Sequence, residues 1–298
     1  MKWTCSLMLV TMLFYSLVSC QKEINDTIIN PVVNPAVNDS IYLDKLYELY
    51  DAGSGVDTQE VAIFSYDAQK RIIKWENRDF HTNDIFQLFT YDYSGNDSIP
   101  YKSGLLEYGS PGSVPDTTIT FHTFDVNQRN LRDSSIIKRQ NGTYIYYYVT
   151  DFTYDTDKKY GFARNISIAP SPGITYTKDT ATIDASGNIL SSKRYKDYGT
   201  GFELISTSAY TYDTHINPFA KQWINKAHQI FPFGETFYWE YMPYNNVSTQ
   251  IEYIISSGPA PWMNLTNTYT YTSNGLTAKA VTVDGTDTET IIYTYKSL

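Results

Sequence analysis

Cysteine is scarce in this 298-residue chain, which contains only Cys5 and Cys20. Both lie in the first twenty residues, so the remainder of the chain has no thiol with which to form a disulfide. A domain without disulfides depends on the burial of apolar surface for its stability. The segment 39–298 is long enough to bury such a core. The sequence therefore predicts a single domain over residues 39–298 that is stabilised by packing.

Positive charge is also in short supply, with 23 Lys and Arg against 32 Asp and Glu and a net charge of −9. An acidic surface repels phosphate backbones, which argues against nucleic-acid partners. The four histidines, at positions 81, 122, 215 and 228, show none of the spacings typical of zinc ligands. The sequence also contains neither a G-x-S-x-G motif nor a phosphate-binding loop. No metal, cofactor or catalytic residue is assigned from motifs.

A signal-like segment occupies the N-terminus, where Lys2 precedes an apolar run from Leu7 to Val18. This order is typical of a secretory signal, and the run is close to the lower length limit for a membrane-spanning helix. It ends at "LVSC", with Ser19 before Cys20. The sequence predicts a signal peptide over residues 1–19.

The "LVSC" pattern resembles the lipobox of bacterial lipoproteins, whose cysteine becomes the lipidated first residue after cleavage. On that resemblance Cys20 is the lipidation site, and the protein is anchored to a membrane without spanning it. Residues 20–38 contain Pro31, Pro35 and many asparagines, with no helix or strand period. They are predicted to form a flexible tether, which would reach about 60 Å when fully extended.

A degenerate unit recurs about seven times along the rest of the chain, with an aromatic or apolar residue, a polar turn, and a return to Ile or Leu. Its clearest copies are "FSYDAQKRII" (64–73), "HTFDVNQRNL" (122–131), "ATIDASGNIL" (181–190) and "TYTSNGLTAK" (270–279). Asp67, Asp125 and Asp184 occupy the same corner position, where a short carboxylate can accept the next backbone N–H groups in an Asx-turn. The tyrosine before the aspartate is expected to pack its ring on a neighbouring strand and keep its hydroxyl near water. Each unit is predicted to be a β-hairpin.

The segments between the turns have the alternation of half-buried antiparallel strands. "NTYTYTS" (267–273) and "ETIIYTY" (289–295) place aromatic and β-branched residues on alternate faces. The 28 tyrosines exceed what a small core can bury, which favours a sheet that is open on one side.

Two helices are expected on this sheet. Within residues 38–53, Leu43, Leu46, Tyr47 and Tyr50 recur at helical spacing, and Gly53 suits the end of a helix. In the second segment, 217–230, Asn217 can cap a helix that begins at Pro218.

The lipobox, the "FSYD", "FTYD" and "YTYD" units, the "YDTHINPF" run and the closing "YTYTSNGLTAKAVTV" together carry a family resemblance. They resemble uncharacterised surface lipoproteins of Bacteroidetes, which are similar to the Tyr-Asp repeats of RHS-type proteins. The resemblance implies a large antiparallel sheet of hairpins displayed at the outer membrane, with no established activity. About seven units are fewer than full RHS proteins use for a closed shell. The predicted fold class is therefore mainly β, a large twisted antiparallel sheet of repeated hairpins with one or two short helices.

Aromatic clusters supply the candidate binding residues. The stretches "TFYWEYMPY" (236–244) and "PAPWMNL" (259–265) contain flat rings on which sugars can stack: Tyr238, Trp239, Tyr241, Tyr244 and Trp262. The alternative is that the tryptophans belong to the core. Two acidic clusters, at 151–157 and 284–289, match no calcium loop and are interpreted as turn carboxylates.

The sequence predicts a lipid-anchored, non-enzymatic protein of the cell envelope, with the outer membrane as its location and either face of that membrane still open. It would serve as a binding or scaffold module, and its candidate partners are a glycan or another envelope protein. One alternative is a carbohydrate-active enzyme whose catalytic carboxylates carry no sequence mark. Another is a carrier of lipid or of a partner lipoprotein.

Overall fold

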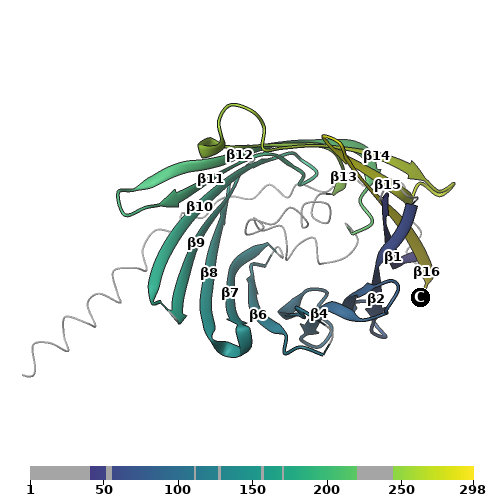
Figure 1. Ribbon diagram of the computed structural model, residues 1–298, viewed down its shortest axis with the longest axis horizontal. Coiled ribbons are helices and arrows are strands. Elements are labelled where there is room, and N and C mark those ends of the chain that lie inside the picture. Colours follow the sequence, from purple (N-terminus) through teal and green to yellow (C-terminus); the bar gives the residue numbers. More distant parts are fainter. Residues whose placement is uncertain are drawn as a thin grey trace, which may run out of the picture. The chain divides into compact units, whose positions relative to one another are not determined.

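The computed structural model describes residues 41–51, 56–110, 112–126, 129–155, 158–169, 171–219 and 244–298. Sixteen strands in these residues form one antiparallel sheet that closes into a barrel (Figure 1). Each strand pairs with its neighbours in sequence, and β1 pairs with β16. The strands are β1 (Ile41–Asp51), β2 (Val56–Tyr66), β3 (Ile72–Asp79), β4 (Ile85–Tyr93), β5 (Pro100–Glu107), β6 (Asp116–Phe124), β7 (Asn130–Arg139), β8 (Tyr144–Tyr154), β9 (Lys158–Ala169), β10 (Gly173–Ile183), β11 (Ile189–Asp197), β12 (Phe202–Ile216), β13 (Asn245–Ile254), β14 (Met263–Tyr271), β15 (Thr277–Asp284) and β16 (Asp287–Ser297), with single-turn 3-10 helices η1 (Gln140–Gly142) and η3 (Ile255–Ser257).

Closure of the sheet shows that the prediction of an open twisted sheet was wrong. The repeat units supply the turns that join β2 to β3, β4 to β5 and so on to β15, so they account for every strand except β1 and β16. These two strands pair with each other over Ile41–Tyr50 and complete the circle. Because the segment of β1 was predicted to be a helix, the prediction lacked the strand that closes the barrel.

The segment predicted as the first helix is β1, and a β-bulge explains the helical spacing. The register with β16 passes from Leu43 opposite Tyr295 to Lys45 opposite Thr294, so Asp44 is the extra residue. An extra residue shifts the alternation by one, and residues three apart then face the same side. Leu43 and Leu46 are accordingly both buried, with 1% and 4% exposure.

The second predicted helix falls almost entirely outside the described residues, as do the signal peptide, Cys20 and the tether. At its expected start, the Asn217 side chain accepts a hydrogen bond from the Phe219 N–H at 2.9 Å.

The predicted Asx-turns are confirmed at all three corner aspartates. Asp67 Oδ1 accepts the N–H of Arg71 at 3.0 Å, and its Oδ2 accepts Arg71 Nε at 2.7 Å. Asp125 and Asp184 make the equivalent bonds to the residue four positions on, which is Arg129 or Asn188. Burial would raise the pKa of Asp67, but the hydrogen bonds from Arg71 and Gln69 outweigh it and hold that pKa below its usual value. These three units therefore form the same turn with equivalent contacts.

The tyrosine hydroxyls do not stay near water as expected. Each reaches back to a main-chain carbonyl on the preceding strand, at 2.6–2.8 Å: Tyr66 to Leu43, Tyr93 to Ile72, Tyr154 to Asn130, Tyr212 to Ile189, and Tyr295 to Thr277. Burial raises the pKa of four of these phenols, those of Tyr66, Tyr154, Tyr212 and Tyr295. These bonds tie successive strands together on the inside of the barrel, where water competes less for the carbonyl.

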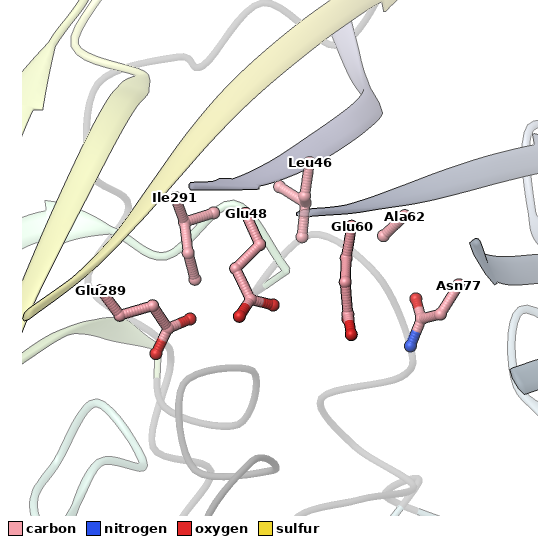
Figure 2. Close-up of a pocket in the computed structure, with 7 residues that line it drawn as sticks. All are labelled: Leu46, Glu48, Glu60, Ala62, Asn77, Glu289 and Ile291. Atoms are coloured by element: carbon pink, nitrogen blue, oxygen red, sulfur yellow. The ribbon is translucent and has the colours of Figure 1, made fainter. Parts of the chain in front are cut away.

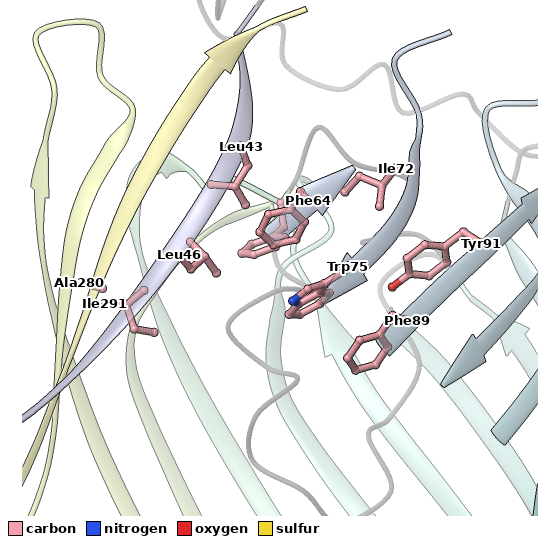
Figure 3. Packing of buried hydrophobic residues seen from close by; sticks show 10 residues of the cluster. Leu43, Leu46, Phe64, Ile72, Trp75, Phe89, Tyr91, Ala280 and Ile291 are labelled. Atoms are coloured by element: carbon pink, nitrogen blue, oxygen red, sulfur yellow. The ribbon is translucent and has the colours of Figure 1, made fainter. Parts of the chain in front are cut away.

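The interior of the barrel is identified by a contact that crosses it. Phe219, just after β12, packs against Phe64 of β2 and Trp75 of β3, with ring centroids 5.8 and 6.1 Å apart. Several strands separate β12 from β2 and β3 in the wall, so these side chains meet through the inside. The main buried cluster comprises Leu43, Leu46, Phe64, Ile72, Trp75, Phe89, Tyr91, Phe219, Ala280 and Ile291 (Figure 3). One rim of the barrel carries the start of β1, the end of β16 and the repeat turns, and we call it the terminal rim. We call the other rim the opposite rim.

Candidate functional site: a carboxyl-lined pocket inside the barrel

Three glutamates from neighbouring strands point toward one another inside the barrel (Figure 2). They are Glu48 on β1, Glu60 on β2 and Glu289 on β16. With Leu46, Ala62, Asn77 and Ile291 they line a cavity of ≈ 50 Å³. Since about 10–15 Å³ by this measure is enough to hold one water, this space admits a few waters or a small polar group of a ligand.

Strand register places these carboxyls side by side. Glu48 lies directly opposite Glu60 in the β1–β2 ladder, and it lies opposite Ile291 in the β1–β16 ladder. Residues two apart on a strand share a face, so Glu289 points to the same side as Ile291. The bulge at Asp44 is upstream of all these pairs and decides that Glu48 faces inward.

The electrostatics of the pocket favour a shared proton. Burial, the charges of Glu48 and Asp79, and a hydrogen bond with Glu48 together raise the pKa of Glu60 to about 7. Burial also raises the pKa of Glu48, although the hydrogen bond from Glu60 opposes that increase. Both carboxyls therefore hold a proton more readily than a free glutamate does, and one proton shared between them is favoured, with Glu60 as the donor.

This arrangement limits the chemistry of the pocket. Among the described residues, no group of three His, Cys, Asp or Glu side chains is arranged to hold a metal ion. Glu48 and Glu60 are in hydrogen-bond contact, whereas glycosidase carboxyls stand roughly 5–9 Å apart. The pocket therefore suits recognition of a hydroxyl or ammonium group of a ligand better than glycoside cleavage.

The facing wall of the barrel, on β9 to β11, carries basic groups. Arg194 Nε lies 2.9 Å from Asp179 Oδ1. Lys159 is buried, and burial lowers the pKa of its amine to about 7 against the opposing effect of Asp133. Among the described residues, the three pocket glutamates thus lie on β1, β2 and β16, whereas Lys159 and the Arg194–Asp179 pair lie on the facing wall.

The structure does not bring together the two predicted glycan-contact residues that it describes. Tyr244 immediately precedes β13 at the terminal rim, and its carbonyl accepts the N–H of Asn217 at 2.9 Å. Trp262 immediately precedes β14 at the opposite rim and is 54% exposed. The ten residues of β13 separate the two by about 30 Å. Tyr238, Trp239 and Tyr241 lie outside the described residues.

The pocket glutamates were missed for a definable reason. Glu48 stood in a segment interpreted as a helix, where it would face water. Glu289 was noted only as a turn carboxylate in the 284–289 cluster, although it is the third residue of β16. Alternation on both strands with one bulge in β1 is the signal that would have placed them on the same face.

Comparison with known proteins shows a fold and no family. No family model matches the chain, and no curated protein matches it. A porin-like protein from Bacteroides vulgatus ATCC 8482 has a similar structure, with a TM-score of 0.54 and 11% identity over 86% of this chain and 99% of that one. A porin-like protein from Bacteroides uniformis ATCC 8492 gives a TM-score of 0.46 and 17% identity over 86% and 95%. The chain therefore has a closed barrel fold similar to that of the first of these porin-like proteins.

Within the described part of the chain, no helix combines the length and the apolar character required to cross a bilayer.

Proposed function

We propose that this chain is a lipid-anchored protein of the cell envelope that binds a ligand inside its barrel, with the barrel wall facing water and not lipid. The observation that carries this proposal is the distribution of charge on the outward face. A barrel embedded in a bilayer presents an apolar band to the lipid, and one Lys or Arg at mid-depth costs about 2–4 kcal/mol.

Strand β3 illustrates the outward charges most clearly. Lys74, Glu76 and Arg78 alternate with the inward Trp75 and Asn77, so all three point outward along one short strand. Glu76 lies 3.1 Å from the Lys74 ammonium and 3.3 Å from the Arg78 guanidinium. Such a ladder of ions is stable in water and would be costly against lipid.

Outward ion pairs recur elsewhere in the wall. Lys102 on β5 lies 2.8 Å from Asp92 on β4, and Arg132 on β7 lies 2.5 Å from Asp151 on β8. The Asp151 of one predicted acidic cluster is therefore half of an ion pair. Ion pairs therefore lie on the outward face of the wall at three places between β3 and β8, which supports attachment through Cys20.

Loss of the anchor tests this proposal. Cys20→Ala removes the only thiol available for lipidation after signal cleavage, so we expect the exported full chain to move from the membrane fraction to the soluble fraction. Fractionation of a Gram-negative host that processes lipoproteins, followed by a carbonate wash, measures this. Cys5→Ala is the matched control and should leave the protein in the membrane fraction. A Cys20→Ala protein that stays in washed membranes would overturn the proposal in favour of an embedded barrel.

Glycan binding at the opposite rim is a second candidate, favoured by the exposure of Trp262. An indole face that is half exposed can stack on a sugar ring without rearrangement of the barrel. On a glycan array, Trp262→Ala should reduce binding at least tenfold. Tyr253→Ala, at a similarly exposed aromatic on β13, should leave it unchanged. An array on which the unaltered protein binds nothing would reject this candidate.

A further inference from the structure

We propose that Ser103, His122 and Asp133 form a nucleophilic triad inside the barrel that acts on esters with a small apolar acyl group. Ser103 Oγ lies 2.9 Å from His122 Nε2, and His122 Nδ1 lies 2.6 Å from Asp133 Oδ1. A nucleophile, a base and a group that orients the base, joined in this order, are the geometric signature of serine acyl transfer. This proposal stands apart from the lipid anchor and does not depend on it.

The sheet itself sets the geometry of the three residues. They come from the neighbouring strands β5, β6 and β7, and His122 lies directly opposite Asp133 in the β6–β7 ladder. Ser103 lies opposite Thr120, two residues from His122 on the same face of β6. A triad held on three paired strands is more rigid than one held on loops, and rigid positioning is what acyl transfer requires.

Burial and hydrogen bonding assign a role to each side chain. The His122 side chain is only 2% exposed and that of Asp133 is 15% exposed, whereas Ser103 is half-buried. The carboxylate on Nδ1 assigns the ring proton to that nitrogen, which leaves Nε2 to accept from the serine hydroxyl. Asn130, 1% exposed, donates from Nδ2 to Asp133 Oδ1 at 2.8 Å. Asp133 and Asn130 are thus positioning residues for His122.

The surroundings of Ser103 indicate the substrate class. Leu105 is two residues along β5 on the same face, and Phe124 lies 6.2 Å from the His122 ring; both pack on the main buried cluster. These side chains suit an acyl chain of a few carbons. The glutamates of the carboxyl-lined pocket repel anions, so neutral or cationic esters are favoured over anionic ones.

The reaction balances without any added reagent other than water. Ser103 Oγ forms a bond to the ester carbonyl carbon, the C–O bond to the alcohol breaks, and His122 moves the serine proton to the departing alcohol. Water then attacks the acyl-enzyme, loses its proton to His122, and releases the acid while Ser103 regains its hydrogen.

The rate is expected to be modest because the sheet provides no backbone oxyanion hole at Ser103. β5 is paired on both sides, so its main-chain N–H groups bond within the sheet. Loss of one oxyanion donor costs about 10²–10³ in kcat for enzymes that have one. An irreversible phosphorus probe, which needs only one event for each molecule, is therefore the sharper test.

The experiment treats the purified full chain with a neutral alkyl fluorophosphonate and locates the adduct by peptide mass spectrometry. We expect Ser103 Oγ to form a bond to phosphorus as the P–F bond breaks and fluoride leaves. Ser103→Ala should abolish labelling. Ser135→Ala is the matched control, because Ser135 also faces inward and bonds to Thr120 Oγ1 at 2.8 Å, and it should keep the rate of the unaltered protein.

A pH profile tests the positioning role of Asp133. Asp133→Asn should lower the labelling rate about 10²-fold and shift the pH at which the rate is half-maximal, a readout that simple loss of stability does not move. Three results would overturn the proposal. The first is the absence of an adduct on Ser103 in the folded, unaltered protein. The second is an unchanged labelling rate in Ser103→Ala, and the third is an equal labelling rate for Ser103 in the folded and the urea-unfolded chain. A positive result would add hydrolysis to the binding role and replace the non-enzymatic prediction.

Discussion

The two rims of the barrel are built on different plans. At the terminal rim, Asp67, Asp125 and Asp184 close their turns through the same bonds to the residue four positions on. The opposite rim has varied connections. Asp79 accepts the N–H groups of His81 and Thr82, while Asp197 accepts those of Gly199 and Gly201.

This difference indicates that the terminal rim holds the barrel together, whereas the residues that can recognise a ligand lie nearer the opposite rim. The repeated turns and the inward tyrosine bonds join successive strands in the same way at several places around the barrel. The half of the wall nearer the opposite rim carries Glu48, Glu60 and Glu289, which do not repeat. We therefore expect changes at the terminal rim to alter stability and changes near the opposite rim to alter binding.

The largest effect is expected from Trp75→Ala. Trp75 is 5% exposed and stacks on Phe89 with centroids 4.9 Å apart, so its truncation should lower the free energy of unfolding by about 3–5 kcal/mol. Trp262→Ala, at the opposite rim, should change it by less than about 0.5 kcal/mol. Urea denaturation followed by circular dichroism measures both. Similar losses in the two variants would show that the exposed opposite rim contributes as much to stability as the packed interior of the barrel.

A smaller effect is expected from Asp67→Ala, at about 2 kcal/mol. The change leaves the Arg71 N–H and guanidinium without their carboxylate partner in a part-buried turn. Arg71→Asn should cost less than about 1 kcal/mol, because Asn188 makes the equivalent bonds to Asp184. Thermal and urea midpoints of the two variants give the comparison. An Arg71→Asn variant as unstable as Asp67→Ala would mean that the turns are not equivalent.

Tyr66→Phe isolates one of the inward hydroxyl bonds. Removal of the hydroxyl leaves the Leu43 carbonyl without this donor and should lower the free energy of unfolding by about 1 kcal/mol. Tyr101→Phe, at a tyrosine that is 48% exposed, should have almost no effect. Equal urea midpoints for the two variants would show that these bonds contribute nothing to the barrel.

The smallest effect concerns pH and the carboxyl-lined pocket. The pKa of Glu60 rises from 4.5 to about 7 on folding, so the folded chain binds more protons between these values and loses stability as pH rises through them. Glu60→Gln should flatten this slope and raise the stability at pH 8 by about 1 kcal/mol, after allowance for solvent screening of a half-exposed group. Urea midpoints from pH 4.5 to 8 measure the slope. The exposed Glu203→Gln should retain it, and an unchanged slope in Glu60→Gln would contradict the shared proton.

Local patterns in the sequence predicted most of the strands and turns. Tyr-Asp corners indicated hairpins because a short carboxylate and its neighbouring N–H groups interact within five residues, whatever surrounds them. The inward tyrosine bonds could not be predicted in this way, since they join residues 18–24 positions apart. The Ser103, His122 and Asp133 contacts were hidden for the same reason, with separations of 19 and 11 residues.

The sequence by itself determined the mainly β character, the turn chemistry at Asp67, Asp125 and Asp184, and the absence of disulfides from residues 39–298, because these depend on composition or on neighbours in the chain. Only the tertiary structure decided that the sheet closes, since one bulge at Asp44 and the pairing of β1 with β16 depend on strands about 250 residues apart. Closure in turn created an inside. It converted scattered glutamates into one pocket, because a side chain's neighbours across a barrel are set by register and not by spacing in the sequence.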